Sequence, residues 1–513
     1  MPRTVDQSQR ITLAEATERF ARRGDAIALQ SPDRGAVGYA ELADRVEWLV
    51  AALVDLGLAP GERLALLLSN GSRIIECYLA CARSGIVAVP LSERATFGEL
   101  LHQLGDSAPA ALVYSEDAAE LIEAVRAESA CPSLLIATGS DPGGLSYEDL
   151  LRSSPTPAEL PTPLAESLFC LMYTGGTTGV PKAAEQTQLS WAASIRGVAR
   201  EWKLDESDRH LAVLPMDHVS WFSTMSMLLV GGTTFIEGGW NPERALEVVA
   251  REGITTMNMI PTMFGDFLEA IAGRPELSTR TLRLLTVAGS PMPVEMYRRG
   301  IELIGPIIGS VYGMTETSGP VSFLLPTDLS ADRLRSGGRP GPAVELAILG
   351  ADGGQTDGRE PGEIGLRGPQ VTSGYLNQPE ATAAAFRNGW FLTGDVGRTD
   401  DRGLVHIVDR SKDMVKSGGF NVYPKEVEEV LYTHPDVLEA AVVGVPDERW
   451  IEAVHAGVVL RGESALDAEG LRAYCRARLP GYKAPKVVHL EARLPRTKVG
   501  KFDKRALRER YSD

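Results

Sequence analysis

The chain has 513 residues, more than one hydrophobic core normally organises, so we expect at least two lobes. Its composition, with 44% hydrophobic and 23% charged residues, is typical of a globular protein. A net charge of −16 and the lack of a basic tract exclude nucleic acid as the main partner, because phosphate binding needs a concentrated basic face.

The sequence also argues against export and against a membrane span. The polar N-terminal stretch lacks the apolar core of a signal peptide, and no apolar run reaches the roughly 20 residues that cross a bilayer. The five cysteines are scattered without a CxxC pair, which gives no transition-metal site and fits a reducing compartment. Cys77 and Cys81 have the i,i+4 spacing of a buried helix face. We therefore expect a cytoplasmic protein.

Helical and strand patterns alternate through the first two-thirds of the chain. Residues 39–57 place apolar side chains on one helical face and stop at Gly57. Such alternation predicts parallel sheets with crossover helices. The proline-rich stretch 153–163 predicts a surface connection. Strands are expected at 63–68, 86–91, 111–115 and 134–138, and a second α/β series is expected from about 167 to 325.

The pattern changes twice in the last third. After residue 338, glycine-rich turns separate short apolar runs and predict a small β-rich lobe. Near residue 410, Pro424 predicts a helix start and residues 440–445 predict a strand. We place a mobile boundary at Asp409–Lys412, which divides the chain into an N-terminal core, 1–409, and a C-terminal lid, 410–513.

A glycine- and threonine-rich segment, residues 173–182, follows an apolar strand pattern. Glycines let backbone N–H groups turn toward one anion, and hydroxyl groups and a lysine add donors and charge. The segment departs from the GxxxxGK[ST] pattern because Pro181 precedes the lysine and Ala183 follows it. It predicts a polyphosphate-binding loop, with a plain turn as the alternative. Its binding residues would be Thr174, Gly175, Gly176, Thr177, Thr178, Gly179 and Lys182.

Further polar segments follow in order, and each one taken singly could be a turn or a solvated charge cluster. They are Ala288-Gly289-Ser290-Pro291, Tyr312-Gly313-Met314-Thr315-Glu316, Trp390 to Asp395, Asp409-Arg410, Lys416 to Asn421, and Pro495 to Lys501. With the glycine-rich loop, they resemble the adenylate-forming superfamily of acyl- and aryl-CoA ligases, luciferases and the adenylation domains of peptide synthetases. The resemblance covers essentially the whole chain.

The resemblance implies an α/β fold with a large N-terminal domain, made of two αβ subdomains and a small β-barrel, and a small mobile α+β lid. It implies an ATP-dependent enzyme that forms an acyl-adenylate and releases pyrophosphate. The implied cofactors are ATP and Mg²⁺, with a small organic acid as substrate and CoA as co-substrate. Whether the chain forms a homodimer is left open.

By resemblance, Tyr312 stacks on adenine, Glu316 binds Mg²⁺, and Asp395 holds the ribose with Arg410. Lys501 would bridge the carboxylate and the α-phosphate, with Lys498 as its nearest rival. Catalysis is thus expected from Lys501, Thr315 and Glu316. Nucleotide contacts are expected from the loop residues above and from Ser290, Pro291, Tyr312, Gly313, Met314, Thr315, Asp395, Arg410 and Lys501.

The acid pocket is the part where the chain departs from the family pattern. An aromatic residue usually stands where this chain has Asp217, so we expect Asp217 to face the pocket and select a polar or amino-substituted acid. A protein partner, such as His218 or a backbone N–H, is the alternative. The expected pocket residues are Asp217, His218, Trp221, Ala288, Gly289, Ser310 and Val311. The expected hinge and thiol-tunnel residues are Lys412, Lys416, Gly418 and Gly419.

Several functions remain open on the sequence alone. A CoA ligase comes first because the thiol-tunnel segment is intact. An enzyme that passes the acyl group to a carrier protein or an amine comes second. A third is a relative in secondary metabolism that activates nitrite to diazotise an aryl amine. A non-catalytic nucleotide sensor is disfavoured because Lys501, Glu316 and Asp395 are all present.

Overall fold

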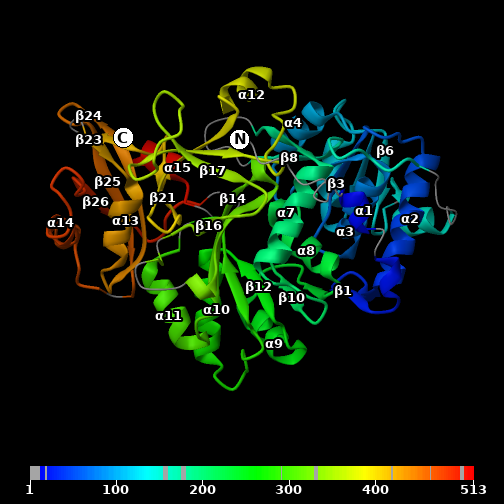
Figure 1. Ribbon diagram of the computed structural model, residues 1–513, viewed down its shortest axis with the longest axis horizontal. Helices are drawn as coiled ribbons and strands as arrows, with labels where there is room; N and C mark the ends of the chain where they lie inside the picture. Colours follow the sequence, from blue (N-terminus) through cyan, green and yellow to red (C-terminus); the bar gives the residue numbers. More distant parts are fainter. Residues whose placement is uncertain are drawn as a thin grey trace.

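Two large, mainly parallel sheets form the body of the protein, and two smaller sheets complete it (Figure 1). The α/β class expected from the sequence is confirmed. The computed structural model describes residues 12–17, 20–141, 143–153, 160–174, 181–290, 292–328, 333–334, 336–417, 420–462, 464–496 and 502–512. None of the helices in these ranges combines the length and the apolar character that a bilayer span requires.

The first large sheet has seven strands in the order β7-β6-β5-β3-β4-β8-β9, all parallel except β9. Strands β3 to β6 match the apolar runs predicted at 63–68, 86–91, 111–115 and 134–138. Helices α4 (Phe97–Ser107) and α5 (Ala119–Val125) cover one face. The strands are β3 (Arg63–Leu67), β4 (Val87–Pro90), β5 (Ala111–Tyr114), β6 (Leu134–Ala137), β7 (Leu145–Ser146), β8 (Leu168–Tyr173) and β9 (Ala183–Thr187).

The second large sheet has nine strands in the order β16-β15-β14-β13-β12-β10-β11-β1-β2. The six strands β14, β13, β12, β10, β11 and β1 run parallel. Strand β15 pairs antiparallel with β14, β16 pairs antiparallel with β15, and β2 pairs antiparallel with β1. The N-terminal strands join this sheet rather than the first, which the sequence did not predict. The strands are β1 (Ile27–Ser31), β2 (Gly35–Gly38), β10 (Arg209–Ala212), β11 (Thr233–Ile236), β12 (Thr256–Met259), β13 (Leu284–Val287), β14 (Ile308–Met314), β15 (Gly319–Leu324) and β16 (Arg339–Pro340).

The two large sheets share one core. Their facing sides bury α2 (Tyr39–Asp55), α3 (Ser72–Ser84), α7 (Gln188–Glu201) and α8 (Phe222–Val230). Cys77 and Cys81 of α3 are both fully buried, as their spacing predicted. The outer face of the second sheet is covered by α9 (Pro242–Glu252), α10 (Pro261–Gly273) and α11 (Val294–Ile304).

Two small antiparallel sheets form the rest of the chain. The third sheet, where the resemblance implies a β-barrel, has the order β17-β18-β20-β19 with β21 paired to β20. The fourth has the order β23-β22-β25-β24, and β26 adds in parallel to β25. In the third sheet the strands are β17 (Glu345–Leu349), β18 (Gly362–Arg367), β19 (Phe386–Arg387), β20 (Trp390–Thr399) and β21 (Val405–Arg410). In the fourth they are β22 (Val415–Ser417), β23 (Phe420–Val422), β24 (Val437–Asp447), β25 (Ile451–Leu460) and β26 (Val487–Leu490).

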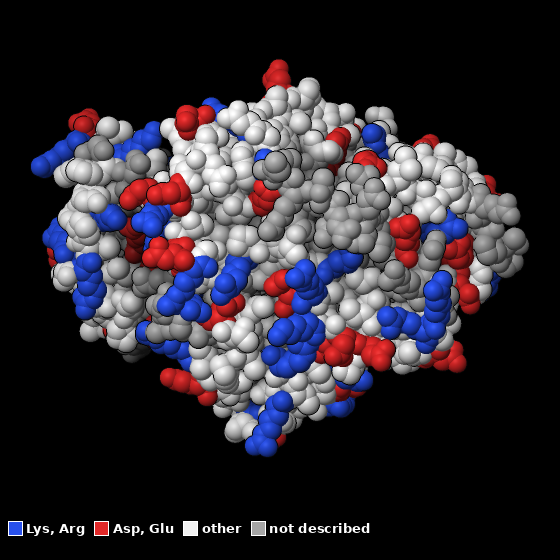
Figure 2. All heavy atoms as spheres, in the orientation of Figure 1, with Lys and Arg blue, Asp and Glu red and all other residues white. Residues whose placement is uncertain are grey.

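The C-terminal helices cover both faces of the fourth sheet, which lies at one side of the molecule (Figure 1). Helix α13 begins at Pro424, as predicted. Over the face shown in Figure 2, basic side chains are interspersed with acidic ones. The C-terminal helices are α13 (Pro424–Tyr432), α14 (Ala468–Arg476) and α15 (Lys504–Ser512), and the short remaining ones are α1 (Leu13–Thr17), α6 (Tyr147–Ser153) and α12 (Pro379–Ala385).

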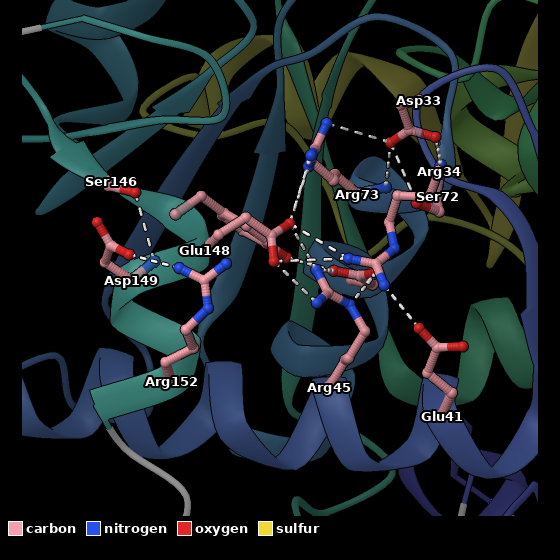
Figure 3. Close-up of polar contacts among 12 residues, drawn as sticks. Asp33, Arg34, Glu41, Arg45, Ser72, Arg73, Ser146, Glu148, Asp149 and Arg152 are labelled. Carbon is pink, nitrogen blue, oxygen red and sulfur yellow. Dashed lines mark hydrogen bonds and ion pairs between the residues drawn. The ribbon is translucent and has the colours of Figure 1, made fainter.

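A buried charge network ties three helices of the first lobe together (Figure 3). Arg45 of α2 contacts Glu76 of α3 at 2.8 Å and Glu148 of α6 at 3.0 Å. The side chains of Arg45 and Glu76 are 5% and 0% exposed. Tyr147 donates a further hydrogen bond of 2.8 Å to Glu76. Because Arg45 and Glu76 have little contact with water, removal of either side chain would leave the other charge buried without this partner.

We expect Glu76→Ala to lower the free energy of unfolding by about 3 kcal/mol, since Arg45 loses a buried partner. Glu41→Ala is the matched control. Glu41 pairs with Arg34 at 2.6 Å, but its side chain is 44% exposed, so the loss should stay below about 1 kcal/mol. Urea unfolding of both variants measures the difference, and equal losses would contradict a special role for the buried pair.

Candidate active site

The carboxyl ends of β12, β13 and β14 meet at one edge of the second large sheet. The strands are buried as far as Val287 and Gly309, and the chain then becomes partly exposed at Ala288 and Ser310. In parallel sheets, ligands bind at this edge because the connecting loops diverge there. The segments 288–290 and 310–316, both predicted from the sequence as site segments, therefore lie together at a position suited to a ligand.

The base of the predicted phosphate loop is a tight antiparallel hairpin formed by β8 and β9. The backbone N–H of Thr174 donates to the carbonyl of Lys182 at 2.8 Å, which closes the loop. The Lys182 ammonium lies 5.3 Å from the ring centre of Tyr375. Residues 175–180, which include Gly175, Gly176, Thr177, Thr178 and Gly179, are outside the described residues.

Tyr375 links the loop to Glu316. Its hydroxyl donates to Glu316 Oε1 at 2.9 Å, while Lys182 lies over its ring. Burial and the nearby Glu316 carboxylate raise the pKa of Tyr375, so the hydroxyl keeps its proton. Sequence reasoning did not find Tyr375, because it lies in the ordinary polar turn Ser373-Gly374-Tyr375. The structure thus places the predicted loop lysine and the predicted magnesium ligand around one tyrosine.

Thr315 lies beside the expected acid pocket. Its Oγ1 is 3.4 Å from His218 Nε2, a distance at the long end for a hydrogen bond. Its carbonyl accepts from Gln186 Nε2 at 2.5 Å, and Gln186 Oε1 accepts from Trp191 Nε1 at 2.8 Å. Gln186 is fully buried and had no motif to reveal it. This chain of contacts fixes Thr315 between the two large sheets.

Asp395 connects the second large sheet to the third. Its carboxylate accepts from the Tyr312 hydroxyl at 2.6 Å and pairs with Arg410 Nε at 3.2 Å. Asp395 and Arg410 face each other on the antiparallel strands β20 and β21. Burial, together with the charge of Asp395, raises the pKa of Tyr312, which remains a neutral donor. The three residues predicted to hold the adenosine are therefore in direct contact.

Trp221 differs from the other predicted pocket residues. It is fully buried, and its ring stacks on Tyr78 at 4.1 Å and on Trp191 at 4.0 Å between centroids. This packing makes it part of the shared core. In contrast, Ala288, Gly289, Ser290, Ser310 and Val311 are all partly or fully exposed at the sheet edge, next to Gly313 and Met314, and Pro291 is outside the described residues.

Asp217 has partners in the first lobe. The Ser92 side chain and the positive charge of Arg94, both in the segment that follows β4, act to lower the pKa of its carboxyl group, while Glu93 between them acts to raise it. Burial outweighs these contacts and raises the pKa of Asp217. Neither Ser92 nor Arg94 was predicted as its partner. Selection of the acid by Asp217 stays a prediction, and its carboxylate has protein partners before any substrate binds.

The proposed hinge follows the last strand of the third sheet. Burial, with repulsion from Arg410, lowers the pKa of Lys412. Asp409 accepts from the backbone N–H of Lys425 at 2.9 Å, at the start of α13. Lys416 is exposed on β22, and its N–H donates to Glu452 at 2.7 Å. Three predicted residues, Gly418, Gly419 and Lys501, lie outside the described residues.

The donor set fits Mg²⁺ only in combination with a nucleotide. Among the described residues, no group of three or more His, Cys, Asp and Glu side chains could hold a metal ion. Mg²⁺ at nucleotide sites takes one or two carboxylates, and phosphate oxygens and water complete its shell. Glu316, next to the base of the loop, satisfies that requirement with its single carboxylate.

Comparisons with known proteins agree with this arrangement. The AMP-binding enzyme family matches residues 16–376, and the AMP-binding enzyme C-terminal domain matches residues 426–501. A feruloyl-CoA synthase from Amycolatopsis is 37% identical over 93% of this chain and 94% of its own. The structure of ATP-bound MatB from Rhodopseudomonas palustris superposes with a TM-score of 0.90 at 29% identity, over 98% of this chain and 99% of its own. The structure of the amide bond synthetase McbA from Marinactinospora thermotolerans superposes with a TM-score of 0.88 at 29% sequence identity, over 98% of this chain and 100% of its own.

We expect Asp395→Asn to raise the KM for ATP by about 10²-fold, because the carboxylate that orients Tyr312 and Arg410 loses its charge. The KM for the acid should change little. Tyr312→Phe keeps the ring and removes only the hydroxyl that donates to Asp395, so its effect should stay below tenfold. ATP titration of pyrophosphate release measures both variants. Unchanged ATP affinity in a folded Asp395→Asn variant would contradict a nucleotide-binding role.

Proposed function

This chain belongs to the AMP-binding enzyme family, and from that premise we propose that it is an ATP-dependent, AMP-forming acid–thiol ligase. It would activate a small aryl or short acyl carboxylic acid as an acyl-adenylate and transfer the acyl group to CoA. The observation that carries the proposal is the convergence of Lys182, Glu316, Thr315 and Asp395 at one edge of the second large sheet. The named activity of the feruloyl-CoA synthase relative supports the acid–thiol class.

In the first half-reaction, a carboxylate oxygen of the acid attacks the α-phosphorus of ATP. The bond from that phosphorus to the bridging oxygen breaks, and pyrophosphate leaves. Two anions must approach each other, so the protein's task is to position them and to compensate their charge. We assign this task to the loop that ends at Lys182, to the Thr315 hydroxyl and to Lys501. Glu316 would hold Mg²⁺, which supplies positive charge to the phosphates.

The adenosine end of ATP would be fixed by the third sheet. Asp395 is 4% exposed and is oriented by Tyr312 and Arg410, so little rearrangement is needed to present its oxygens to a ribose. A preoriented acceptor loses less entropy on binding than a mobile one. The ring of Tyr312 is held by the same contact, in the position where the sequence predicts stacking on adenine.

In the second half-reaction, the thiol of CoA attacks the acyl carbon and AMP leaves with the electron pair of the anhydride bond. We propose that residues 410–513 act as a lid that rotates about Lys412 between the two steps. Rotation would replace Lys501 with the strip from Lys416 to Gly419, which would line the thiol's path. The similarity to an amide bond synthetase favours an amine as the second candidate acceptor. A cytoplasmic location is also proposed, since all five cysteines are free.

Lys501→Ala should reduce acid-dependent adenylation by about 10²–10³-fold, because one oriented charged donor to the reacting groups is lost. Thioester formation from a supplied acyl-adenylate should be much less affected. Lys498→Ala is the matched control, three residues away, and should adenylate at close to the wild-type rate. Pyrophosphate exchange separates the two variants, and normal exchange by Lys501→Ala would transfer the role to Lys498.

Lys412→Pro tests the hinge. Proline fixes φ near −65° and prevents the backbone rotation that lid movement needs. We expect the overall reaction to be lost while one half-reaction is retained, and Lys412→Ala to keep both because its backbone remains free. The two half-reactions are measured separately, as pyrophosphate exchange and as thioester formation from a supplied adenylate. Equal loss of both in a folded Lys412→Pro variant would place the hinge elsewhere.

A further inference from the structure

Two uncharged polar side chains on neighbouring strands of the second large sheet have buried atoms without a partner. Asn258 on β12 is 1% exposed and Thr286 on β13 is 0% exposed. Within the part of the chain that the structure describes, Asn258 Nδ2 and Thr286 Oγ1 make no hydrogen bond. The two residues are register partners, so their side chains stand next to each other on one face. Buried polar groups are nearly always paired, so this adjacent pair calls for a ligand or a water molecule.

Their place in the sheet puts them beneath the proposed acid pocket. Side chains alternate between faces, so Thr286 shares its face with Ala288, and Gly309 shares its face with Val311. Ala288 and Val311 are partly exposed at the sheet edge, whereas Asn258, Thr286 and Gly309 are buried. Two residues along a strand span about 6.6 Å. The pair therefore lies one step below these partly exposed strand ends and on the same face, and we call it the floor of the proposed acid site.

A hydrogen-bond chain holds the Asn258 amide in place. Ser223, in the first turn of α8, lies 3.3 Å from Asn258 Oδ1 and 3.2 Å from the carbonyl of Ser220, and these two acceptors share its single hydroxyl hydrogen. His210 lies 3.0 Å from Ser223 Oγ through Nε2 and 3.0 Å from Thr256 Oγ1 through Nδ1. Ser223 follows the segment that carries His218, which is expected to border the acid. With Oδ1 occupied, the amide Nδ2 is the end left to bind something else.

The floor carries no charge. Burial lowers the pKa of His210 to about 4, so its ring is neutral at physiological pH. The other members of the chain, Ser223, Asn258, Thr256 and Thr286, are uncharged residue types. A charged group brought to this floor would find no counter-ion among them, and an apolar group would leave two polar atoms unpaired.

We propose that Asn258 and Thr286 bind a neutral hydroxyl group at the end of the acid substrate remote from its carboxylate. A hydroxyl oxygen can accept from Asn258 Nδ2 and donate its hydrogen to Thr286 Oγ1 in one geometry. The substrate class is then a hydroxy acid, in preference to a plain aryl or fatty acid and to a dicarboxylate. The inference rests on the proposed function, because it takes the edge of this sheet as the acid site.

Matched pairs of acids test the inference on the wild-type enzyme. The pairs are 4-hydroxybenzoate with benzoate, 4-hydroxycinnamate with cinnamate, and 6-hydroxyhexanoate with hexanoate, which differ in length from carboxylate to hydroxyl. Terephthalate serves as the charged analogue. We expect one pair to show a hydroxyl preference of at least tenfold in kcat/KM for pyrophosphate release, and terephthalate to be a poor substrate.

Two near-isosteric variants test whether Asn258 and Thr286 cause the preference for the hydroxylated acid. Thr286→Val and Asn258→Leu should each reduce the hydroxyl preference by about tenfold, the effect of one hydrogen bond. Each should also improve kcat/KM for the unsubstituted acid, because an unpaired polar group is removed from its path. If the two residues had a purely structural role, the variants would lower kcat/KM for both acids of a pair together. Thr234→Val is the control: Thr234 is a fully buried threonine of β11 whose Oγ1 also has no partner among the described residues.

Binding measured by calorimetry with AMP present separates this inference from the proposed function. Equal binding and equal activation of both members in all three pairs would overturn the inference and leave the ligase standing. Preferential binding of a hydroxy acid without pyrophosphate release would refute the ligase and keep the inference. Failure of every acid to bind or react would overturn both. A hydroxyl preference that survives in both variants would assign it to other residues.

Discussion

The packing of the two large sheets against each other is the constraint on which the site depends. Trp221, just before α8, stacks with Tyr78 of α3 and Trp191 of α7, so one aromatic cluster joins elements of both lobes. The loop after β10 is held from across this junction. Tyr78 donates to the carbonyl of Met216 at 2.8 Å, and Asn70 donates to the carbonyl of Leu214 at 3.0 Å. His218 follows directly, so its position is set by the first lobe although it belongs to the second.

Near the same junction, a lysine and a glutamate of the site are held by one tyrosine that lies between them. Tyr375 separates the two charges: the Lys182 ammonium lies over its ring, and its hydroxyl donates to the Glu316 carboxylate. Asp395 and Arg410 form a direct pair, but their strands belong to the third sheet, next to the start of the C-terminal segment. Each group is thereby fixed before a nucleotide binds. Preorganised charges of this kind need little rearrangement in a reaction between two anions.

The pocket floor shows a balance between stability and selection. Leaving the Asn258 amide and the Thr286 hydroxyl unpaired costs roughly 1–3 kcal/mol for each group. Apolar side chains at these two positions would avoid that cost. Met257 and Leu285 are buried apolar residues at the neighbouring positions of the same strands, on the opposite face. Proteins tolerate such local losses where they serve recognition. Rejection of an acid that lacks the matching group is then stronger than an apolar pocket could provide.

The sequence by itself determined the α/β class of the fold and the place of several of its elements, and it singled out the segments that we expect to form the site. Helix and strand periods are local properties, so the strands β3 to β6, the helix α2 and the start of α13 at Pro424 could be read directly. The glycine-rich loop and the segments around Thr315 and Asp395 could be recognised because their residues are adjacent in the chain. The structure confirms the α/β class that this local information predicted.

Only the tertiary structure decided which distant residues meet. Tyr375 and Gln186 lie in unremarkable sequence, yet the packing of the lobes brings them to Glu316 and Thr315. Trp221 was predicted as a pocket residue, but the stack with Tyr78 and Trp191 places it in the core. The partners of Asp217 come from a loop more than a hundred residues earlier in the chain, at Ser92 and Arg94. Such contacts depend on sheet register and on the docking of two lobes, which no local periodicity encodes.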